Sequence, residues 1–107
     1  MTSEEFKEKR SLFLDMAFDT FFEFRDAIKA ADISDDERKG WFDKIDQQTS
    51  HTVDTEEDLN AAVNRLVDLR DNLIDKGILM GWQKVPFSWD NKPFELVNNN
   101  NPKVLPF

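Results

Sequence analysis

The chain contains no cysteine among its 107 residues. Without cysteine it can form neither disulfides nor zinc–cysteine sites, and thiolate catalysis is excluded as well. A chain that needs no disulfides fits a reducing compartment. We therefore expect a protein of the cytoplasm, or one incorporated into a virion that is assembled there.

Long apolar runs are also missing. No stretch approaches the roughly 18 consecutive apolar residues that a membrane-spanning helix needs. The sequence begins MTSEEFKEKR, with acidic residues where a secretory signal requires a basic start. We expect neither a membrane span nor an export signal.

Residues that carry chemistry are few. His51 is the only histidine, and it lies in a polar stretch with no cysteine to activate. The spacing of Gly77 and Gly81 matches no phosphate-binding loop, and the acidic residues do not follow the pattern of a calcium-binding loop. Pairs of carboxylates are common among 22 acidic residues, but they fall on faces predicted to meet solvent. We expect a noncatalytic protein with no catalytic residue, no metal site and no cofactor.

Proline is absent from the first 77 residues, and all four prolines lie beyond Gly77. The residues before this point have helical periodicity, and those after it resemble extended or turn-rich chain. With 39% hydrophobic residues and ten phenylalanines, the chain has material for one core. The sequence predicts an all-α fold, a small three-helix antiparallel bundle over residues 1–77, with an extended, proline-containing C-terminal arm over residues 78–107.

Start and stop signals delimit the expected helices, which cover residues 3–31, 35–48 and 56–76. The N-terminal capping residues are expected to be Thr2, Ser34 and Thr55. Glu5 is the expected capping-box partner of Thr2, and Gly77 ends the third helix because glycine readily adopts the left-handed conformation of a C-terminal cap. Residues 47–54 are polar and aperiodic, so we expect a loop there.

The first predicted helix has two faces. At 100° per residue, one broad apolar stripe suited to a core contains Phe6, Phe13, Leu14, Ala17, Phe18, Phe21, Phe24, Ile28 and Ala31. The opposite face is nearly all acidic and contains Glu4, Glu8, Asp15, Asp19, Glu23 and Asp26. Leu12 and Phe22 fall beside or within the acidic face, where an apolar side chain could contact a partner.

The other two predicted helices each have one apolar face. That of the second is narrow and consists of Trp41, Phe42 and Ile45. That of the third contains Leu59, Ala62, Leu66, Leu69 and Leu73, widened by Val63 and Ile74. Three heptad steps are too few for an extended coiled coil, so we expect packing within one bundle.

The predicted arm repeats a Pro-Phe pair three times and adds Trp82 and Trp89. Proline reduces the entropy lost when a segment becomes ordered, and each aromatic ring can fill a pocket. The residues expected to bind a partner through the arm are Trp82, Phe87, Trp89, Phe94, Val104, Leu105 and Phe107. The arm could equally fold back over its own helices, and the sequence leaves both arrangements open.

The net charge is −8, and the acidity is regional. Residues 32–58 contain ten acidic and three basic residues, a net charge of −7. Such a field repels phosphate backbones and anionic membranes and attracts basic protein surfaces, although high net charge can also serve solubility alone. The acidic residues expected to contact a partner are Glu8, Asp15, Asp19, Glu23, Asp26, Asp35 and Asp36.

Two functional hypotheses follow. The first is a small assembly or accessory subunit of phage or bacterial type, which docks on a neighbouring subunit through its arm and acidic helical face. The second is an acidic inhibitor or nucleic-acid mimic, of the immunity, anti-restriction or anti-CRISPR type, that blocks a basic groove on a target protein. Both predict a protein partner, with no direct contact to nucleic acid or membrane, and the first allows a homo-oligomer.

Overall fold

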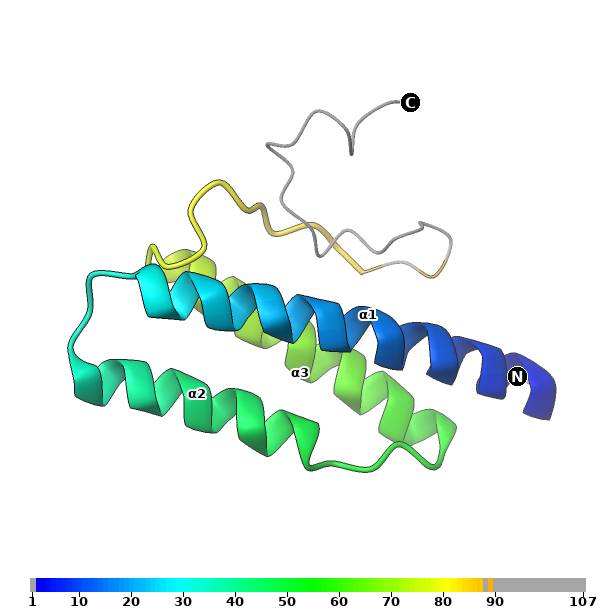
Figure 1. Cartoon of the computed structure of the whole chain (residues 1–107). Helices are drawn as coiled ribbons and strands as arrows, with labels where there is room; N and C mark the ends of the chain where they lie inside the picture. Colours follow the sequence, from blue (N-terminus) through cyan, green and yellow to red (C-terminus); the bar gives the residue numbers. More distant parts are fainter. Residues whose placement is uncertain (1, 88, 90–107) are drawn as a thin grey trace.

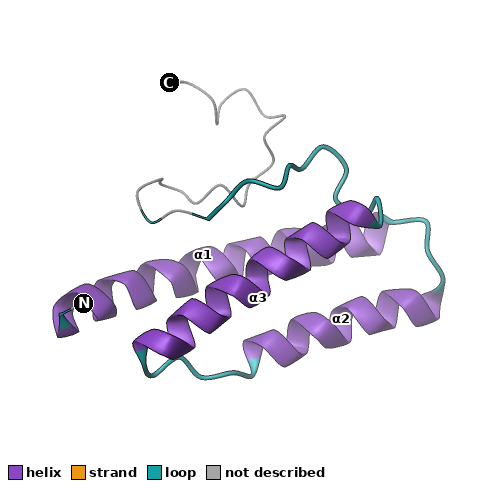
Figure 2. Cartoon of the chain, turned by 180° about the vertical axis from the view of Figure 1, so that it is seen from behind, coloured by secondary structure: helices purple, strands orange, loops and turns teal. Residues whose placement is uncertain are grey.

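A computed structural model describes residues 2–87 and residue 89 of the chain. Three helices occupy most of this part, namely α1 (Ser3–Ala30), α2 (Asp35–Thr49) and α3 (Glu56–Asp75). Each helix reverses direction relative to the one before it, and the views from the two sides agree on this (Figures 1 and 2). The described residues contain no strand. The predicted all-α three-helix bundle is confirmed, with helix ends within one residue of those expected.

All three predicted N-terminal caps are present. The side chains of Thr2, Ser34 and Thr55 each accept a hydrogen bond of 3.1 Å from the backbone N–H three residues on. At α3 the box is reciprocal, because Asp58 Oδ2 accepts from the backbone N–H groups of Asp54 and Thr55. These hydrogen bonds, chiefly that from Asp54, hold the pKa of Asp58 below its usual value. Local sequence therefore determines where each helix begins.

The C-terminus of α3 also follows its sequence signal. Gly77 adopts a φ of 75°, and its N–H donates to the Ile74 carbonyl at 2.9 Å. The N–H of Ile78 donates to the Leu73 carbonyl at 3.0 Å, which completes a Schellman motif. Ile78 and Leu73 are both buried, so the turn directs the chain back onto the bundle.

The core contains the apolar faces of all three helices together with Ile78 and Leu79. On α1 the expected stripe is too broad, because Leu14 and Phe18 are exposed rather than buried. Helix α1 has 28 residues and α2 has 15, which correspond to lengths of about 42 and 22 Å at 1.5 Å per residue. Because α2 is the shorter helix, the N-terminal half of α1 extends beyond it (Figure 1).

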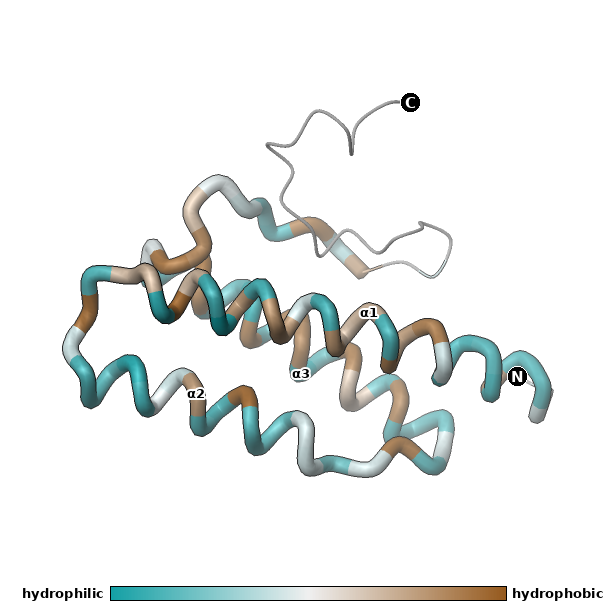
Figure 3. The backbone as a smooth tube through the Cα atoms, in the orientation of Figure 1, coloured by the Kyte–Doolittle hydropathy of each residue, from teal (hydrophilic) through white to brown (hydrophobic). Residues whose placement is uncertain are grey.

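Helix α2 is mostly hydrophilic and contributes little to the core (Figure 3). Trp41 and Ile45 are buried and Phe42 is half-buried, as the narrow apolar face predicts. The helix continues to Thr49, so residues 47–49 are helical and not part of the loop expected there. Within that loop Val53 is buried, because it closes the bundle between α2 and α3.

The described part of the arm lies along α1 and α3 on the side of the bundle opposite α2 (Figures 1 and 2). Residues 82–87 have no regular secondary structure, as the sequence predicts. Four of the arm residues expected to bind a partner, Phe94, Val104, Leu105 and Phe107, lie outside the described residues.

Candidate protein-binding surface

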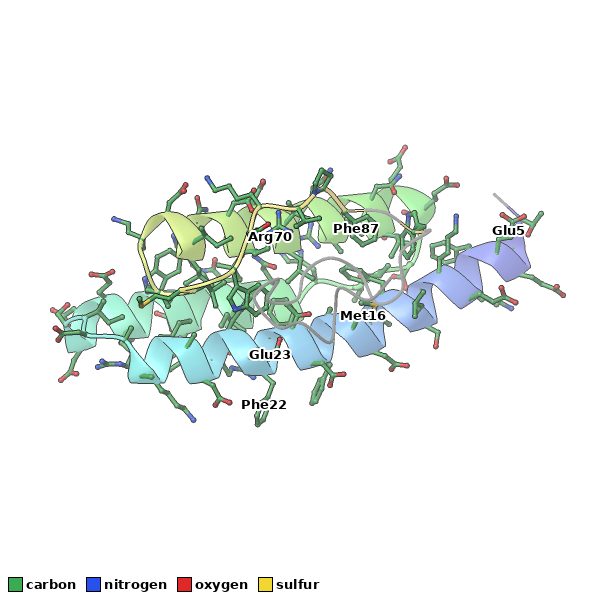
Figure 4. All side chains as sticks on the ribbon, turned by 90° about the horizontal axis from the view of Figure 1, so that it is seen from above. Glu5, Met16, Phe22, Glu23, Arg70 and Phe87 are labelled. Carbon is green, nitrogen blue, oxygen red and sulfur yellow. The ribbon has the colours of Figure 1, made fainter. Side chains whose placement is uncertain are left out.

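Three bulky apolar side chains form a line on the outside of α1. Leu14, Phe18 and Phe22 are spaced four residues apart, and their side chains are 42%, 73% and 59% exposed. Residues four apart on a helix lie one above another, so these three form a continuous strip, which we call the apolar ridge. Figure 4 places Phe22 on the opposite side of the molecule from the arm residue Phe87. Single exposed apolar residues are common in soluble proteins, whereas a contiguous strip often marks an interaction site.

A cavity of about 270 Å³ adjoins the apolar ridge where α2 ends. Its α1 wall comes from the ridge residues Leu14 and Phe18 and from the buried Phe13, Ala17 and Phe21. Its opposite wall comes from Val53 and Ala62. The cavity is therefore lined mainly by apolar groups and opens beside the exposed ridge.

The rim of this cavity is polar and carries hydrogen-bond donors. Gln48, Thr49, His51 and Arg65 contribute to it. The side chain of Gln48 donates to the Arg65 carbonyl at 3.1 Å, which ties α2 to α3. The Arg65 Nε atom is buried and has no hydrogen-bond partner among the described residues.

A line of carboxylates runs parallel to the apolar ridge on the side away from the cavity. Asp15, Asp19 and Glu23 are again four residues apart, and Asp26 lies on the same face. We call these four residues the acidic row. All four are exposed, and within the described part of the chain none of them is in an ion pair. The row therefore presents uncompensated negative charge directly beside exposed aromatic rings.

Within the acidic row, Glu23 has a perturbed pKa. The pKa of Glu23 is raised above its ordinary value, first because the carboxyl group is partly desolvated and then because Asp19 and Asp26 carry like charge nearby. A cation placed alongside Glu23 would lower this pKa, because an opposite charge favours the ionised carboxylate. The electrostatics of this face thus favour a positively charged neighbour.

The structure separates the seven acidic residues expected to contact a partner into two groups. Glu8 and the acidic row are exposed on α1. Asp35 and Asp36 instead occupy the first turn of α2, where acidic residues favour the helix dipole. Asp35 forms an ion pair of 2.9 Å with Arg38. The acidic face is accordingly one line on α1, with a separate acidic helix start on α2.

The three described aromatic residues of the arm pack on their own chain. The ring of Trp82 meets that of Phe24 edge-on with centroids 5.7 Å apart, and Phe87 contacts Trp89 in the same manner at 4.8 Å. Lys9 Nζ lies 5.4 Å from the centroid of the Trp89 ring. All three arm residues are half-buried against the core. Their role in binding a partner stays a prediction.

Sequence reasoning missed the residue that holds the arm. Arg70 is almost fully buried in the C-terminal half of α3. Its Nη1 donates to the Val85 carbonyl at 2.7 Å, and its Nη2 lies 2.8 Å from Asp71 Oδ1. The signal was present, because Arg70 falls three and four residues from Leu73 and Leu66 in the apolar line of α3. A charged residue in such a line requires a buried partner.

Residues 2–87 and 89 show neither a metal site nor a membrane-spanning helix. In that part of the chain no group of three or more histidine, aspartate or glutamate side chains is placed to hold a metal ion. No helix there is long and apolar enough to cross a membrane. His51 is exposed at the rim of the cavity.

No protein-family model, curated protein or solved structure matches the chain, so the surface of α1 is the main guide to function.

Proposed function

We propose that the chain is a noncatalytic accessory or assembly subunit that binds a basic protein through α1. One observation carries the proposal: the apolar ridge lies directly beside the unpaired acidic row on the same helix. The two strips together offer what a protein interface needs. The lack of cysteine is in keeping with a role in the cytoplasm.

Each strip has its own physical role in this proposal. Burial of the exposed rings of Phe18 and Phe22 supplies affinity, at about 25 cal/mol for each Å² of apolar surface removed from water. The acidic row steers a positively charged partner towards the ridge and disfavours partners of the same sign. Aromatic side chains at the centre of an interface commonly dominate its binding energy.

The alternative function is an acidic inhibitor or nucleic-acid mimic that occupies a basic groove. Its support is the net charge of −7 over residues 32–58 and the acidic start of α2. Contacts that depend on charge alone weaken steeply as salt is added, whereas burial of apolar surface does not. The exposed rings of Phe18 and Phe22 favour the first proposal, because a surface that mimics nucleic acid needs no aromatic ridge.

The distal arm is a second proposed docking element. Phe94, Val104, Leu105 and Phe107 are assigned this role from the sequence alone, as apolar anchors separated by polar spacers. Trp82, Phe87 and Trp89 already contact the bundle. A contribution of the arm to docking is therefore proposed mainly for residues beyond Trp89.

Differential co-purification from the native host tests the proposal. The tagged chain is compared with a ridge variant, Phe18→Ser with Phe22→Ser, and with an acidic-row variant, Asp15→Asn with Asp19→Asn and Glu23→Gln. Two matched controls are Met80→Ser, which alters an apolar side chain that is 80% exposed elsewhere, and a variant in which three other exposed acids, Asp32, Asp54 and Asp68, become asparagine.

We expect one basic protein to co-purify with the wild-type chain and both controls and to be lost from both α1 variants. Retention of that protein in moderate salt would favour the accessory role, and its complete release would favour the charge-only inhibitor. If no protein depends on α1, or if nucleic acid binds instead, the proposed function is wrong.

A further inference from the structure

The cavity beside the apolar ridge limits what can occupy it. Its volume of about 270 Å³ is close to the lower limit of the range of roughly 300–1,000 Å³ typical of small-molecule sites. It is not isolated, because Leu14 and Phe18 belong both to its wall and to the exposed ridge. The cavity is small and is open on the side of the ridge. It therefore fits a single apolar side chain that belongs to a larger element lying over the ridge.

The ridge also sets the form of that larger element. Leu14 and Phe22 are eight residues apart, a distance of about 12 Å along α1. A partner helix of about three turns covers this length, and it presents apolar side chains with spacings of three and four residues. Leu14 lies in the N-terminal half of α1, which extends beyond α2 (Figure 1), and Phe18 and Phe22 are exposed although they lie in the other half. A helix laid on the ridge would therefore cover side chains that α2 leaves exposed.

Charge determines which helix fits. The acidic row lies along one flank of the ridge, and the Arg65 side chain lies at the cavity on the other flank. A helix with lysine or arginine along one side therefore has a favoured orientation, with that side against Asp15, Asp19 and Glu23. A second copy of this chain is less suitable, because each copy carries a net charge of −8.

We propose that the apolar ridge and the adjoining cavity form a groove for an amphipathic, basic helix of the partner protein, which inserts one apolar side chain between Phe18 and Val53. This inference rests on the proposed function, since it specifies how the basic partner is bound. The acidic row orients the helix, and the cavity selects for a large apolar residue at one position.

Three synthetic peptides test the groove on the full-length chain. The first is a 15-residue helix of leucine and lysine with its leucines on one face. The second has the same composition with the leucines distributed around the helix, and the third is oligolysine of equal charge. Affinities are measured by titration calorimetry, and binding sites are mapped from backbone amide shifts of the isotope-labelled protein.

We expect the amphipathic peptide to bind at least about tenfold more tightly than the permuted one, which corresponds to about 1.4 kcal/mol. The largest shifts should fall at Leu14, Phe18, Thr49, His51 and Val53, on both sides of the cavity. Phe18→Ala should remove the preference for the amphipathic peptide and leave oligolysine binding unchanged. Met80→Ala, which alters an exposed side chain that does not line the cavity, should have no effect.

The other outcomes separate this inference from the proposed function. Equal binding of all three peptides, with shifts confined to the acidic row, would overturn the groove and leave a basic partner in place. Shifts on the arm side of α3, near Val67 and Trp89, would also overturn the groove, and so would the absence of any binding. The co-purification experiment tests the proposed function independently of these results. A dimer of the chain that Phe18→Ala dissociates would make a second copy the occupant and overturn the choice of a basic helix.

Discussion

Phe24 and Phe18 lie six residues apart on α1, yet their side chains are 0% and 73% exposed. Six residues of α-helix turn through about 600°, so the two rings point in directions about 120° apart. Phe24 contacts Phe21 and Trp82, whereas Phe18 lies on the exposed ridge. The comparison teaches that one helix uses the same residue type for stability on one face and leaves it exposed on another, where we propose that it contacts a partner.

The difference has a cost in free energy. Complete burial of a phenylalanine side chain contributes about 1.5–3 kcal/mol relative to leaving it in water. Phe18 and Phe22 do not contribute this stabilisation, because their rings remain exposed. Charged residues could occupy both positions without disturbing the core. An exposed aromatic pair on a helix that already carries a strong core face supports the proposed contact with a partner.

The largest effect is expected from truncating the two rings in turn. Phe24→Ala should lower the free energy of unfolding by about 3–5 kcal/mol, because it removes a fully buried ring and leaves a cavity. Phe18→Ala should change it by less than about 0.5 kcal/mol, as is usual for a surface position. Urea denaturation followed by circular dichroism measures both values.

Phe22→Ala is the matched control, because Phe22 is also on the ridge and 59% exposed. It should behave as Phe18→Ala does. If Phe18→Ala proves nearly as damaging as Phe24→Ala, Phe18 is part of the core in solution, and the ridge is not a free surface.

A smaller effect is expected at Arg70, whose buried side chain connects α3 to the arm. Arg70→Met removes the donor to the Val85 carbonyl and the cation beside Asp71, which we expect to cost about 2 kcal/mol. Trp82 and Trp89 should then become hydrated, and their fluorescence should shift to longer wavelength. Denaturation curves and tryptophan emission spectra measure the two consequences.

Arg25→Met provides the control for loss of an arginine. Arg25 pairs with Asp46 at 3.1 Å on the surface, and such pairs contribute about 0.2–1 kcal/mol. Tryptophan emission should be unchanged in this variant. An Arg70→Met protein with native emission and proteolytic resistance would mean that aromatic contacts alone hold the arm.

The helices were predictable from sequence because their signals are local. Thr2, Ser34, Thr55 and Gly77 each act within three or four residues, so no knowledge of the tertiary structure is needed. The core face of α3 was predictable for a related reason, since its leucines follow one narrow line. The acidic row was likewise visible as a face opposite the core.

The apolar ridge could be predicted only in part, because Phe22 was expected beside the acidic face whereas Leu14 and Phe18 were assigned to the core stripe. Leu14 and Phe18 lie at the edge of the apolar stripe of α1, and periodicity alone does not say how wide a stripe the neighbouring helices will cover. The answer depends on α2 being too short and too hydrophilic to cover them. Val53 was missed because its burial depends on the closure of a loop. The position of Arg70 in the apolar line of α3 indicated burial, but its partner carbonyl at Val85 could not be predicted because it is fifteen residues away.

The smallest effect is expected at Glu23, on the outer side of α1. Its pKa is raised above the ordinary value of 4.5, so the folded state binds the proton of Glu23 more tightly than the unfolded state does. Above the raised pKa the ionised carboxylate therefore destabilises the fold, and below 4.5 this cost disappears because the group is protonated in both states. Glu23→Gln should raise the free energy of unfolding at neutral pH by a few tenths of a kcal/mol, since the group is largely solvated.

Urea denaturation at pH 7 and at pH 3.5 measures this difference, with Glu8→Gln as the control for loss of an exposed glutamate elsewhere on α1. The gain should be present at neutral pH, absent at the lower pH and specific to Glu23. A loss of stability at neutral pH would mean that Glu23 has a stabilising contact in solution. Glu23→Gln would then raise the free energy of unfolding, whereas Phe24→Ala lowers it strongly. Such a result would mean that the outer surface of α1 is not optimised for folding, as expected if its carboxylates serve a positively charged partner.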